Sequence, residues 1–334
     1  MKLRIHLFLH SSTQLIYSYF YYCQKHKIKM DIEIDKSVHY NCVIIEYQGK
    51  TLFFDYSDDT VFCDDPVKFD FYFKRSLPEK DRKGNVHPVN FNFALAYNSL
   101  SFLTKMNLQF FKDKQSRLEI LRALDVFDWF TNNSHASVDI KNYPSKVEDK
   151  GGTVIFHSRL WDPDRTSLED EKERRRLQND FRINACRIIR KNFKNSSVGL
   201  FPDELSIKLA PDVLLNKKQT GKRSYFEKML NSNIGVADDG LKDTPGWKIG
   251  EYVLSGKAVI STPLNIAVDE FYDGKNFMQL SHRSAYEELP EKIDALLQGK
   301  RYLEMGEENL KWSREYIHPS NYLERIFALV RNEN

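Results

Sequence analysis

Short apolar segments alternate with longer amphipathic segments along this chain of 334 residues. Leu3–Leu9 has the length and composition of a β-strand. Three later apolar runs, 153–156, 234–237 and 258–261, are bounded by turn-forming residues. Between the first two of these runs, Glu169–Lys194 has apolar residues at helical spacing. Strands that alternate with helices are typical of a parallel sheet covered by helices, so we expect an α/β fold.

A polar, glycine-containing segment at 148–152 divides the chain into two parts. The chain is longer than a single hydrophobic core usually supports, which favours two domains. We expect an N-terminal domain over 1–148 and a C-terminal domain over 149–317. The last segment, 318–334, has apolar residues at helical spacing and is predicted to form a closing amphipathic helix.

The long helix predicted over Glu169–Lys194 is expected to have an inner face formed by Leu177, Phe181, Ala185 and Ile188. The same helix carries arginines at 174–176 and further basic residues toward its end. A nucleic-acid-binding protein is one alternative that these residues support, through phosphate neutralisation. Acidic residues are interspersed and the formal net charge is only +3, so a solvated helix face is favoured and no nucleic-acid partner is expected.

The cysteine pattern and the hydropathy suggest a cytoplasmic protein. Four cysteines without paired short spacing indicate neither a disulfide framework nor a zinc motif. Histidines interrupt the apolar N-terminal run, which we interpret as a strand and not as a signal peptide. The sequence contains no stretch of about eighteen consecutive apolar residues, so we expect no membrane-spanning helix. Aromatic residues at 17–22 are followed by lysines. They have two interpretations: a half-buried helix surface, or peripheral contact with the inner face of the membrane.

The segment 231–263 predicts one compact strand–loop–helix–strand unit. A strand at 234–237 runs into a polar loop. Thr244 followed by Pro245 is a typical helix start, because the hydroxyl can cap a free N–H and proline suits the first helical position. Gly256 is predicted to end the helix in the left-handed backbone conformation, a left-handed stop before the next strand.

This predicted helix start favours an anion. Helix N-termini offer free N–H donors and a partial positive charge, and Lys248 adds a full charge nearby. Gly246 and Gly250 leave one helix face without side chains. A ligand or a neighbouring backbone could approach that face, and the local sequence does not decide between them.

Within the same unit, Asp243-x7-Glu251 resembles the nucleotide-binding signature of GT-B glycosyltransferases, usually Glu-x7-Glu. The phrase GWKIGEYVLSGKAVIS is similar to the corresponding segment of bacterial surface-polysaccharide enzymes of that family. The resemblance implies two Rossmann-like domains facing across a cleft, with the C-terminal helix returning to the N-terminal domain. It also implies that Glu251 binds the ribose of a nucleotide-sugar donor, that Asp243 binds the sugar, and that amides near Thr244 and Gly246 hold the diphosphate.

A second segment carries the same resemblance. The apolar run that follows Gly151-Gly152 ends at Arg159, as in the first strand and loop of a GT-B C-terminal domain. In that family a basic residue here offsets charge on the leaving diphosphate, which is the role expected of Arg159. The alternative is a structural ion pair between Arg159 and a nearby aspartate.

Candidates for acceptor chemistry lie in the predicted N-terminal domain. His10 follows the first predicted strand and could act as a general base, and Asp58 could accept the proton of an acceptor hydroxyl. Lys74 and Arg75 end a short apolar strand and could bind a phosphate of the acceptor. Each has an ordinary alternative: a structural histidine, a solvated turn, or solubilising charge.

Other enzyme classes stay open beside GT-B. Asp162-Pro163-Asp164 fits the D-x-D by which metal-dependent GT-A transferases hold a divalent cation. A nucleotide-sugar epimerase of GT-B architecture is a further alternative. Motifs of zinc proteases, esterases, P-loop NTPases and dinucleotide-binding dehydrogenases do not occur in the sequence.

The motifs and the resemblance together imply a metal-independent hexosyltransferase without a cofactor. It would move a sugar from a nucleotide-sugar donor to a hydroxyl of a glycan or lipid-linked oligosaccharide in surface polysaccharide synthesis. Arg159, Lys248 and the helix amides would stabilise the departing diphosphate. The donor base, the sugar, the stereochemical outcome and the acceptor do not follow from the sequence.

Overall fold

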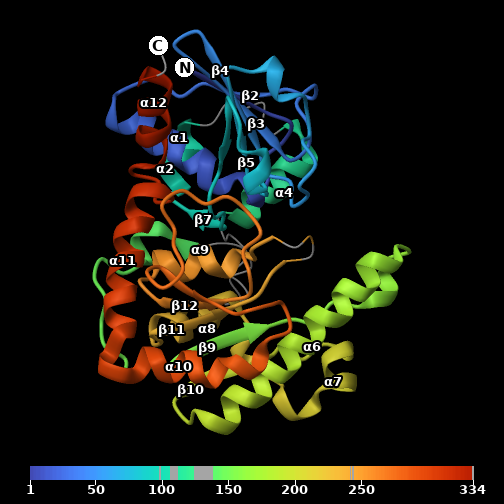
Figure 1. Ribbon diagram of the computed structural model, residues 1–334. Helices are drawn as coiled ribbons and strands as arrows, with labels where there is room; N and C mark the ends of the chain where they lie inside the picture. The colour runs from blue at the N-terminus through green and yellow to red at the C-terminus, as the bar shows by residue number, and fades with distance from the viewer. Residues whose placement is uncertain (98, 106–111, 124–137, 241, 243, 333–334) are drawn as a thin grey trace. The chain divides into compact units, whose positions relative to one another are not determined.

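The computed structural model describes residues 1–97, 99–105, 112–123, 138–240, 242 and 244–332 (Figure 1). The chain forms two compact units. The first comprises Met1–Tyr143, Ile266–Asp269 and Ser313–Asn334, and the second comprises Pro144–Asn265 and Glu270–Trp312. Each unit contains a sheet with helices packed on it, so the expected α/β class is confirmed.

The sheet of the first unit has six strands in the order β2-β1-β3-β4-β5-β6. Neighbouring strands are parallel except where β3 runs antiparallel to both β1 and β4. A two-residue turn, Gln48–Gly49, joins β3 to β4, and both residues have the positive φ that such a hairpin needs. The strands are β1 Lys2–Ile5, β2 Ile32–Ile34, β3 Cys42–Tyr47, β4 Lys50–Asp55, β5 Phe71–Lys74 and β6 Val86–Pro88.

The predicted strand over Leu3–Leu9 is wrong in its second half. Strand pairing ends at Ile5, and the chain then turns through η1, His10–Ser12, into α1. Leu7, Phe8 and Leu9 are buried all the same. Their apolar character therefore reflects core packing and not membership of the sheet. The helices of this unit are α1 Thr13–Lys25, α2 Ser99–Lys105, α4 Lys114–Ala123 and α12 Tyr322–Asn332, and β7 Leu95–Ala96 pairs with β8 Val138–Asp139.

The C-terminal helix α12 packs within the first unit, as the resemblance implied. The ring of Phe327 stacks on Tyr47 with 3.9 Å between centroids and meets the edge of Tyr22 at 4.8 Å. At the start of the same helix, Glu324 is ion-paired with Lys25 of α1 at 2.8 Å. The end of the chain is thus held by aromatic packing and by charge.

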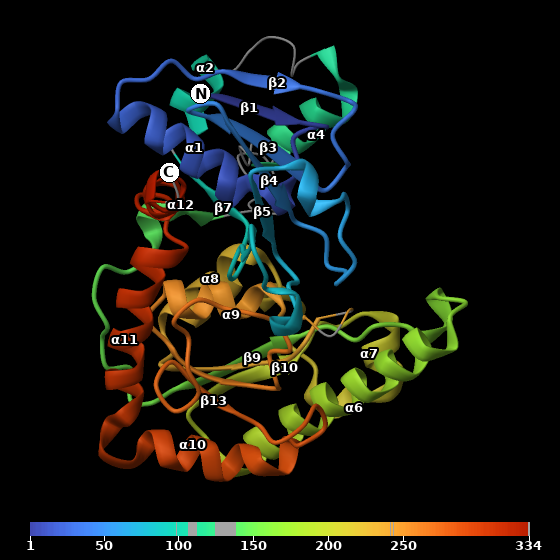
Figure 2. The same cartoon turned by 45° about the horizontal axis from the view of Figure 1, so that its top comes forward.

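The sheet of the second unit has five parallel strands in the order β10-β9-β11-β12-β13. The chain leaves β9 for β10 on one side and returns to β11 on the other, so the strand order reverses at β9. Figure 2 shows α8 and α9 on one face of this sheet and α6 and α10 on the other. The strands are β9 Val154–Ser158, β10 Ser196–Leu200, β11 Ile234–Ala237, β12 Ala258–Ser261 and β13 Phe277–Gln279. The helices are α6 Glu169–Asn192, α7 Glu204–Leu209, α8 Lys222–Leu230, α9 Trp247–Leu254, α10 Leu289–Leu297 and α11 Arg301–Tyr316, the last continuing into the first unit.

The inner face of α6 is rotated by about one residue from the predicted face. Phe181 and Ala185 are buried as expected, but Leu177 is 39% exposed. Gln178 and Arg182 point inward in its place. Their side chains donate hydrogen bonds to the Asp239 carbonyl and the Asp238 carboxylate respectively, so polar contacts with the loop after β11 set the rotation of this helix.

Helix α9 begins at Trp247, later than the predicted start at Thr244 and Pro245. Pro245 forms an isolated antiparallel bridge with Asp239, and the Thr244 carbonyl accepts a hydrogen bond from the Gly240 amide. These contacts hold both residues in the loop, and Gly246, in extended conformation, becomes the N-cap. At the other end, Gly256 has φ of +64°, which confirms the predicted left-handed stop.

Candidate functional site

A pocket of about 360 Å³ lies in the second unit at the C-terminal ends of β9, β10 and β11. The N-terminal turns of α8 and α9 form its other wall. In parallel α/β sheets this edge, where the strand order reverses, is the usual place for a ligand. Four residues selected from the sequence as donor ligands line this pocket together: Arg159, Gly246, Lys248 and Glu251.

The Glu251 carboxylate is nearly inaccessible, since the residue is 4% exposed. It is ion-paired with the ammonium of Lys222, the first residue of α8. Both side chains line the pocket. A buried carboxylate without a partner destabilises the folded state, so the ion pair with Lys222 allows Glu251 to be buried at the pocket wall.

Lys248 lies in the first turn of α9, among groups of mixed character. Its ammonium is 3.3 Å from the Ser158 hydroxyl, 3.9 Å from the Asp238 carboxylate and 5.4 Å from the centroid of the Phe156 ring. Burial lowers the pKa of Lys248 to about 8, with Asp238 opposing the shift and Arg182 adding to it. Lys248 is therefore mostly charged at pH 7 and loses its charge as the pH rises through about 8.

Arg159 follows β9 directly and is exposed at the pocket. Its guanidinium carbon lies 5.0 Å from the centroid of the Phe201 ring, which places the flat cation on an aromatic surface. Among the residues that the structure describes, no carboxylate pairs with this guanidinium. The alternative of a structural pair with a nearby aspartate therefore finds no support in the described part of the chain.

Among the further pocket residues that escaped the sequence analysis, three carry a charge that is ion-paired: Arg182, Lys222 and Asp238. Arg182 and Asp238 form a buried ion pair with 2.5 Å between Nε and Oδ2. A signal existed for Arg182, because it borders the apolar face of α6 that contains Phe181 and Ala185. Lys222 and Asp238 had no comparable signal, since lysines and aspartates in loops and first turns are ordinary solvated residues.

The pocket carries an excess of positive charge. Four cationic side chains, Arg159, Arg182, Lys222 and Lys248, face two carboxylates, Asp238 and Glu251. His157 adds no charge near neutrality, because burial, followed by the nearby Lys248, lowers its pKa to about 4. With the positive end of the α9 helix dipole, this arrangement suits a ligand with several negative charges.

Two donor residues of the predicted set do not appear in the lining. Thr244 is buried in the loop before α9, where its carbonyl accepts a hydrogen bond from the Gly240 amide. Asp243 lies outside the described residues. The predicted contact of Asp243 with a sugar thus stays a prediction.

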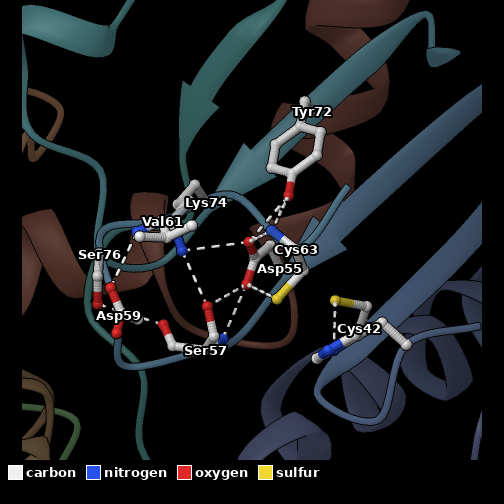
Figure 3. A network of polar contacts seen from close by, with 10 residues as sticks. Cys42, Asp55, Ser57, Asp59, Val61, Cys63, Tyr72, Lys74 and Ser76 are labelled. Atoms are coloured by element: carbon white, nitrogen blue, oxygen red, sulfur yellow. Dashed lines mark hydrogen bonds and ion pairs between the residues drawn. The ribbon is translucent and has the colours of Figure 1, made fainter. Parts of the chain in front are cut away.

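In the first unit, Lys74 cannot serve as the acceptor ligand that the sequence suggested, because its ammonium is fully buried. It lies 3.1 Å from Asp55 and 2.9 Å from the Ser57 hydroxyl (Figure 3). This lysine compensates the equally buried Asp55 carboxylate, so it has no surface left for a phosphate.

The other acceptor candidates are differently placed. Arg75 is largely buried and forms an ion pair with the exposed Asp58. Asp58, predicted as a catalytic base, therefore has a local cation as partner. His10 opens the 3-10 turn η1, and its side chain lies outside the described part of the chain.

The D-x-D segment has a local structural role. Asp162 is the N-cap of η5, Pro163–Arg165, and its carboxylate accepts a hydrogen bond of 3.0 Å from the Asp164 amide. The same carboxylate lies 3.6 Å from the Arg165 guanidinium. These contacts explain an aspartate at position 162 without a metal ion.

Comparison with known proteins finds no matching family model and no matching curated relative. Similar solved structures include GT-B glycosyltransferases, the family that the sequence resembles. The C-terminal domain of the group 1 glycosyltransferase LpcC from Francisella tularensis is 14% identical, with 55% of this chain and 99% of that domain covered and a TM-score of 0.36. Staphylococcus aureus TarM, solved with UDP, α-GlcNAc-glycerol and Fondaparinux, is 15% identical, with 65% of this chain and 42% of TarM covered and a TM-score of 0.37.

Sucrose-phosphate synthase from Thermosynechococcus elongatus is 8% identical, with 80% of this chain and 75% of the synthase covered and a TM-score of 0.34. At these identities the similarity concerns the fold alone. Within the described residues, no helix has the length and apolar character required to cross a membrane.

Proposed function

We propose that the second unit binds a nucleotide sugar in this pocket and that the protein is a glycosyltransferase. The observation that carries the proposal is the convergence of Arg159, Lys248 and Glu251 on one pocket at the strand-order reversal. Cations and helix amides suit a diphosphate, and a buried carboxylate with a fixed partner suits the hydroxyls of a ribose.

In this proposal each side chain has a defined task. The Arg159 guanidinium and the Lys248 ammonium bind the diphosphate oxygens and stabilise the charge that develops there when the glycosidic bond breaks. Glu251 accepts hydrogen bonds from the ribose through the oxygen that Lys222 does not hold. Because Lys222 fixes the carboxylate beforehand, little side-chain entropy is lost on binding.

The acceptor is proposed to be a hydroxyl of a glycan or of a lipid-linked oligosaccharide in surface polysaccharide synthesis. The transfer is proposed to need no divalent cation, because the side-chain cations supply the charge that a metal ion would otherwise bring. Addition of magnesium or manganese ions should therefore leave the rate of transfer unchanged.

A thermal-unfolding screen against nucleoside diphosphates and their sugar conjugates tests the donor site. A true ligand at 100 times its dissociation constant stabilises the folded state by about 2.7 kcal/mol, whereas a non-binder has no effect. At the same ligand concentration the stabilisation should fall to about 1.4 kcal/mol in Glu251→Ala, as a tenfold loss of affinity predicts. It should persist in full in Glu227→Ala, which removes an exposed acid of the neighbouring helix α8. Absence of stabilisation by every nucleotide would remove the proposal.

Release of nucleoside diphosphate from the conjugate that binds, with and without glycan acceptors, tests the reaction. Acceptor-dependent release supports a transferase. Isomerisation of the conjugate without any acceptor would instead identify an epimerase.

A further inference from the structure

Two cysteines and a histidine of the first unit meet at one end of its sheet, although the sequence separates them. One potential ligand atom each of His39, Cys42 and Cys63 lies within 4.8 Å of the other two. The Cys42 sulfur is 3.8 Å from Nδ1 of His39. Figure 3 shows the sulfur atoms of Cys42 and Cys63 turned toward each other beside Asp55.

Backbone hydrogen bonds fix all three residues. The Cys42 amide donates to the His39 carbonyl at 2.9 Å, which forms a His-x-x-Cys turn at the start of β3. Cys42 is paired with Asp55 in the β3–β4 register. The Cys63 amide donates to the Asp55 carboxylate at 3.1 Å, so the strand partner of Cys42 also holds the loop that carries Cys63.

The charge around the cluster is balanced before any ion binds. The carboxylate of Asp55 is already compensated by Lys74, and both side chains are completely buried. Asp55 also accepts hydrogen bonds from Tyr72 and Ser57. The Cys63 thiol also donates a hydrogen bond to Asp55 at 3.4 Å, which a bond from this sulfur to a metal ion would replace. The two thiolates formed on binding carry a charge that one divalent ion neutralises.

We propose that His39, Cys42 and Cys63 bind a zinc ion. Thiolate and imidazole are the ligands that zinc prefers, and bonds of about 2.3 Å to sulfur and about 2.0 Å to nitrogen would draw the three ligand atoms closer by up to about 1 Å. His39 is exposed and Cys63 is half-buried, so the ion can enter from solvent and a water molecule completes the tetrahedron. Each thiol gives its proton to solvent as its sulfur–zinc bond forms, so about two protons leave for each ion bound.

The ion would connect two loops of the first unit. His39 belongs to the loop between β2 and β3, and Cys63 belongs to the loop between β4 and β5. The second loop also carries Asp58. A zinc ion would thus stabilise the loop between β4 and β5, in addition to the side-chain contacts that already hold it.

The test uses the full-length protein, first treated with a chelator and a thiol reductant and then dialysed free of both. We expect it to bind one equivalent of zinc, measured by elemental analysis. Cobalt in place of zinc should give the intense visible absorption of a tetrahedral site together with sulfur-to-cobalt charge-transfer bands. Zinc should also raise the unfolding temperature.

Cys63→Ser and His39→Ala should each reduce zinc affinity by at least tenfold while circular dichroism stays unchanged. His39→Ala changes an exposed residue, so its loss of zinc cannot be attributed to misfolding. Cys23→Ser, at a buried thiol of helix α1, is the matched control and should bind zinc like the parent protein. Less than a tenth of an equivalent in the parent, an octahedral cobalt spectrum without sulfur bands, or equal binding by Cys63→Ser would overturn the proposal. So would a Cys42–Cys63 disulfide that persists as the stable form in the presence of zinc and reductant.

Discussion

The Lys222 ammonium pairs with the Glu251 carboxylate inside the pocket; Lys222 is the first residue of α8, and Glu251 lies in the second turn of the neighbouring helix α9. The pair explains how an acid can be almost fully buried at the wall of a cationic pocket. It also gives the carboxylate a fixed orientation, with one oxygen engaged by Lys222. A ligand that uses Glu251 has the other oxygen of the carboxylate as its least engaged acceptor.

Glu251→Gln should weaken nucleotide binding by about tenfold, because one charge-assisted hydrogen bond to a ribose is worth about 1.5 kcal/mol. The side-chain shape is conserved, so the fold should persist. Calorimetric titration with a ribonucleoside diphosphate and with its deoxy analogues is the measurement. The parent protein should prefer the ribonucleotide, and Glu251→Gln should lose that preference. Equal discrimination by both proteins would mean that Glu251 does not contact the ribose.

Nucleotide affinity should fall as pH rises through about 8. Burial lowers the folded-state pKa of Lys248 from 10.5 to about 8, so above that pH the empty pocket loses one positive charge that a diphosphate would need. The sign for stability is opposite. The charged lysine is penalised in the folded state at low pH, and the penalty disappears as pH rises from about 8 toward 10.5.

Affinity measured from pH 6.5 to 9.5 in Lys248→Arg tests the cause, because arginine stays charged over that range. Lys248→Arg should show a flatter profile than the parent. Lys208→Met, at an exposed lysine of α7, should keep the parent profile. A decrease above pH 8 that persists in Lys248→Arg would assign the titration to another group.

The sequence was informative where one residue's chemistry is tied to a local pattern. Gly256 has the predicted left-handed conformation, and Arg159 and Glu251 reach one pocket although they lie far apart in the chain. The α/β class followed from the alternation of elements. The conformation of Gly256 follows from short-range backbone preference, whereas Arg159 and Glu251 were selected through the resemblance of their segments to GT-B transferases.

The remaining features depend on contacts between distant segments, which no local pattern records. The start of α9 is set by the bridge between Pro245 and Asp239, and the rotation of α6 by Gln178 and Arg182. Lys74 has the sequence appearance of a surface lysine, yet Asp55 on the adjacent strand draws it into the core. Tertiary pairing therefore overrides local preference at each of these positions.

Phe327→Ala should destabilise the protein by about 3–5 kcal/mol, the usual cost of removing a buried aromatic side chain. The ring is completely buried between Tyr47 and Tyr22, and its loss should detach α12 from the first unit. Urea unfolding followed by fluorescence gives the free energy. Val67→Ala, at a side chain 87% exposed in the same unit, should change it by less than about 0.5 kcal/mol. A loss below about 1 kcal/mol in Phe327→Ala would show that α12 contributes little to stability.

Gly235→Ala should destabilise the second unit and weaken nucleotide binding together. Gly235 lies in β11 beneath the buried ring of Tyr252 in α9, and an added Cβ would be only 2.4 Å from a ring carbon. The ring is enclosed, so relief requires α9 to move away from the sheet, at a cost of about 1–3 kcal/mol. Since Lys248 and Glu251 lie on α9, the same movement displaces two proposed ligands of the donor.

A double-mutant cycle identifies the cause of that loss. In a Tyr252→Ala background the added methyl group has space, so the second substitution should cost less than about 0.5 kcal/mol in urea unfolding. If Gly235→Ala instead has its full destabilising effect in that background, the loss of stability comes from the backbone of β11 and not from the Tyr252 ring. Nucleotide titration of Gly235→Ala at a temperature where it remains folded separates the two effects. A normal affinity there would show that the position of α9 does not control the pocket.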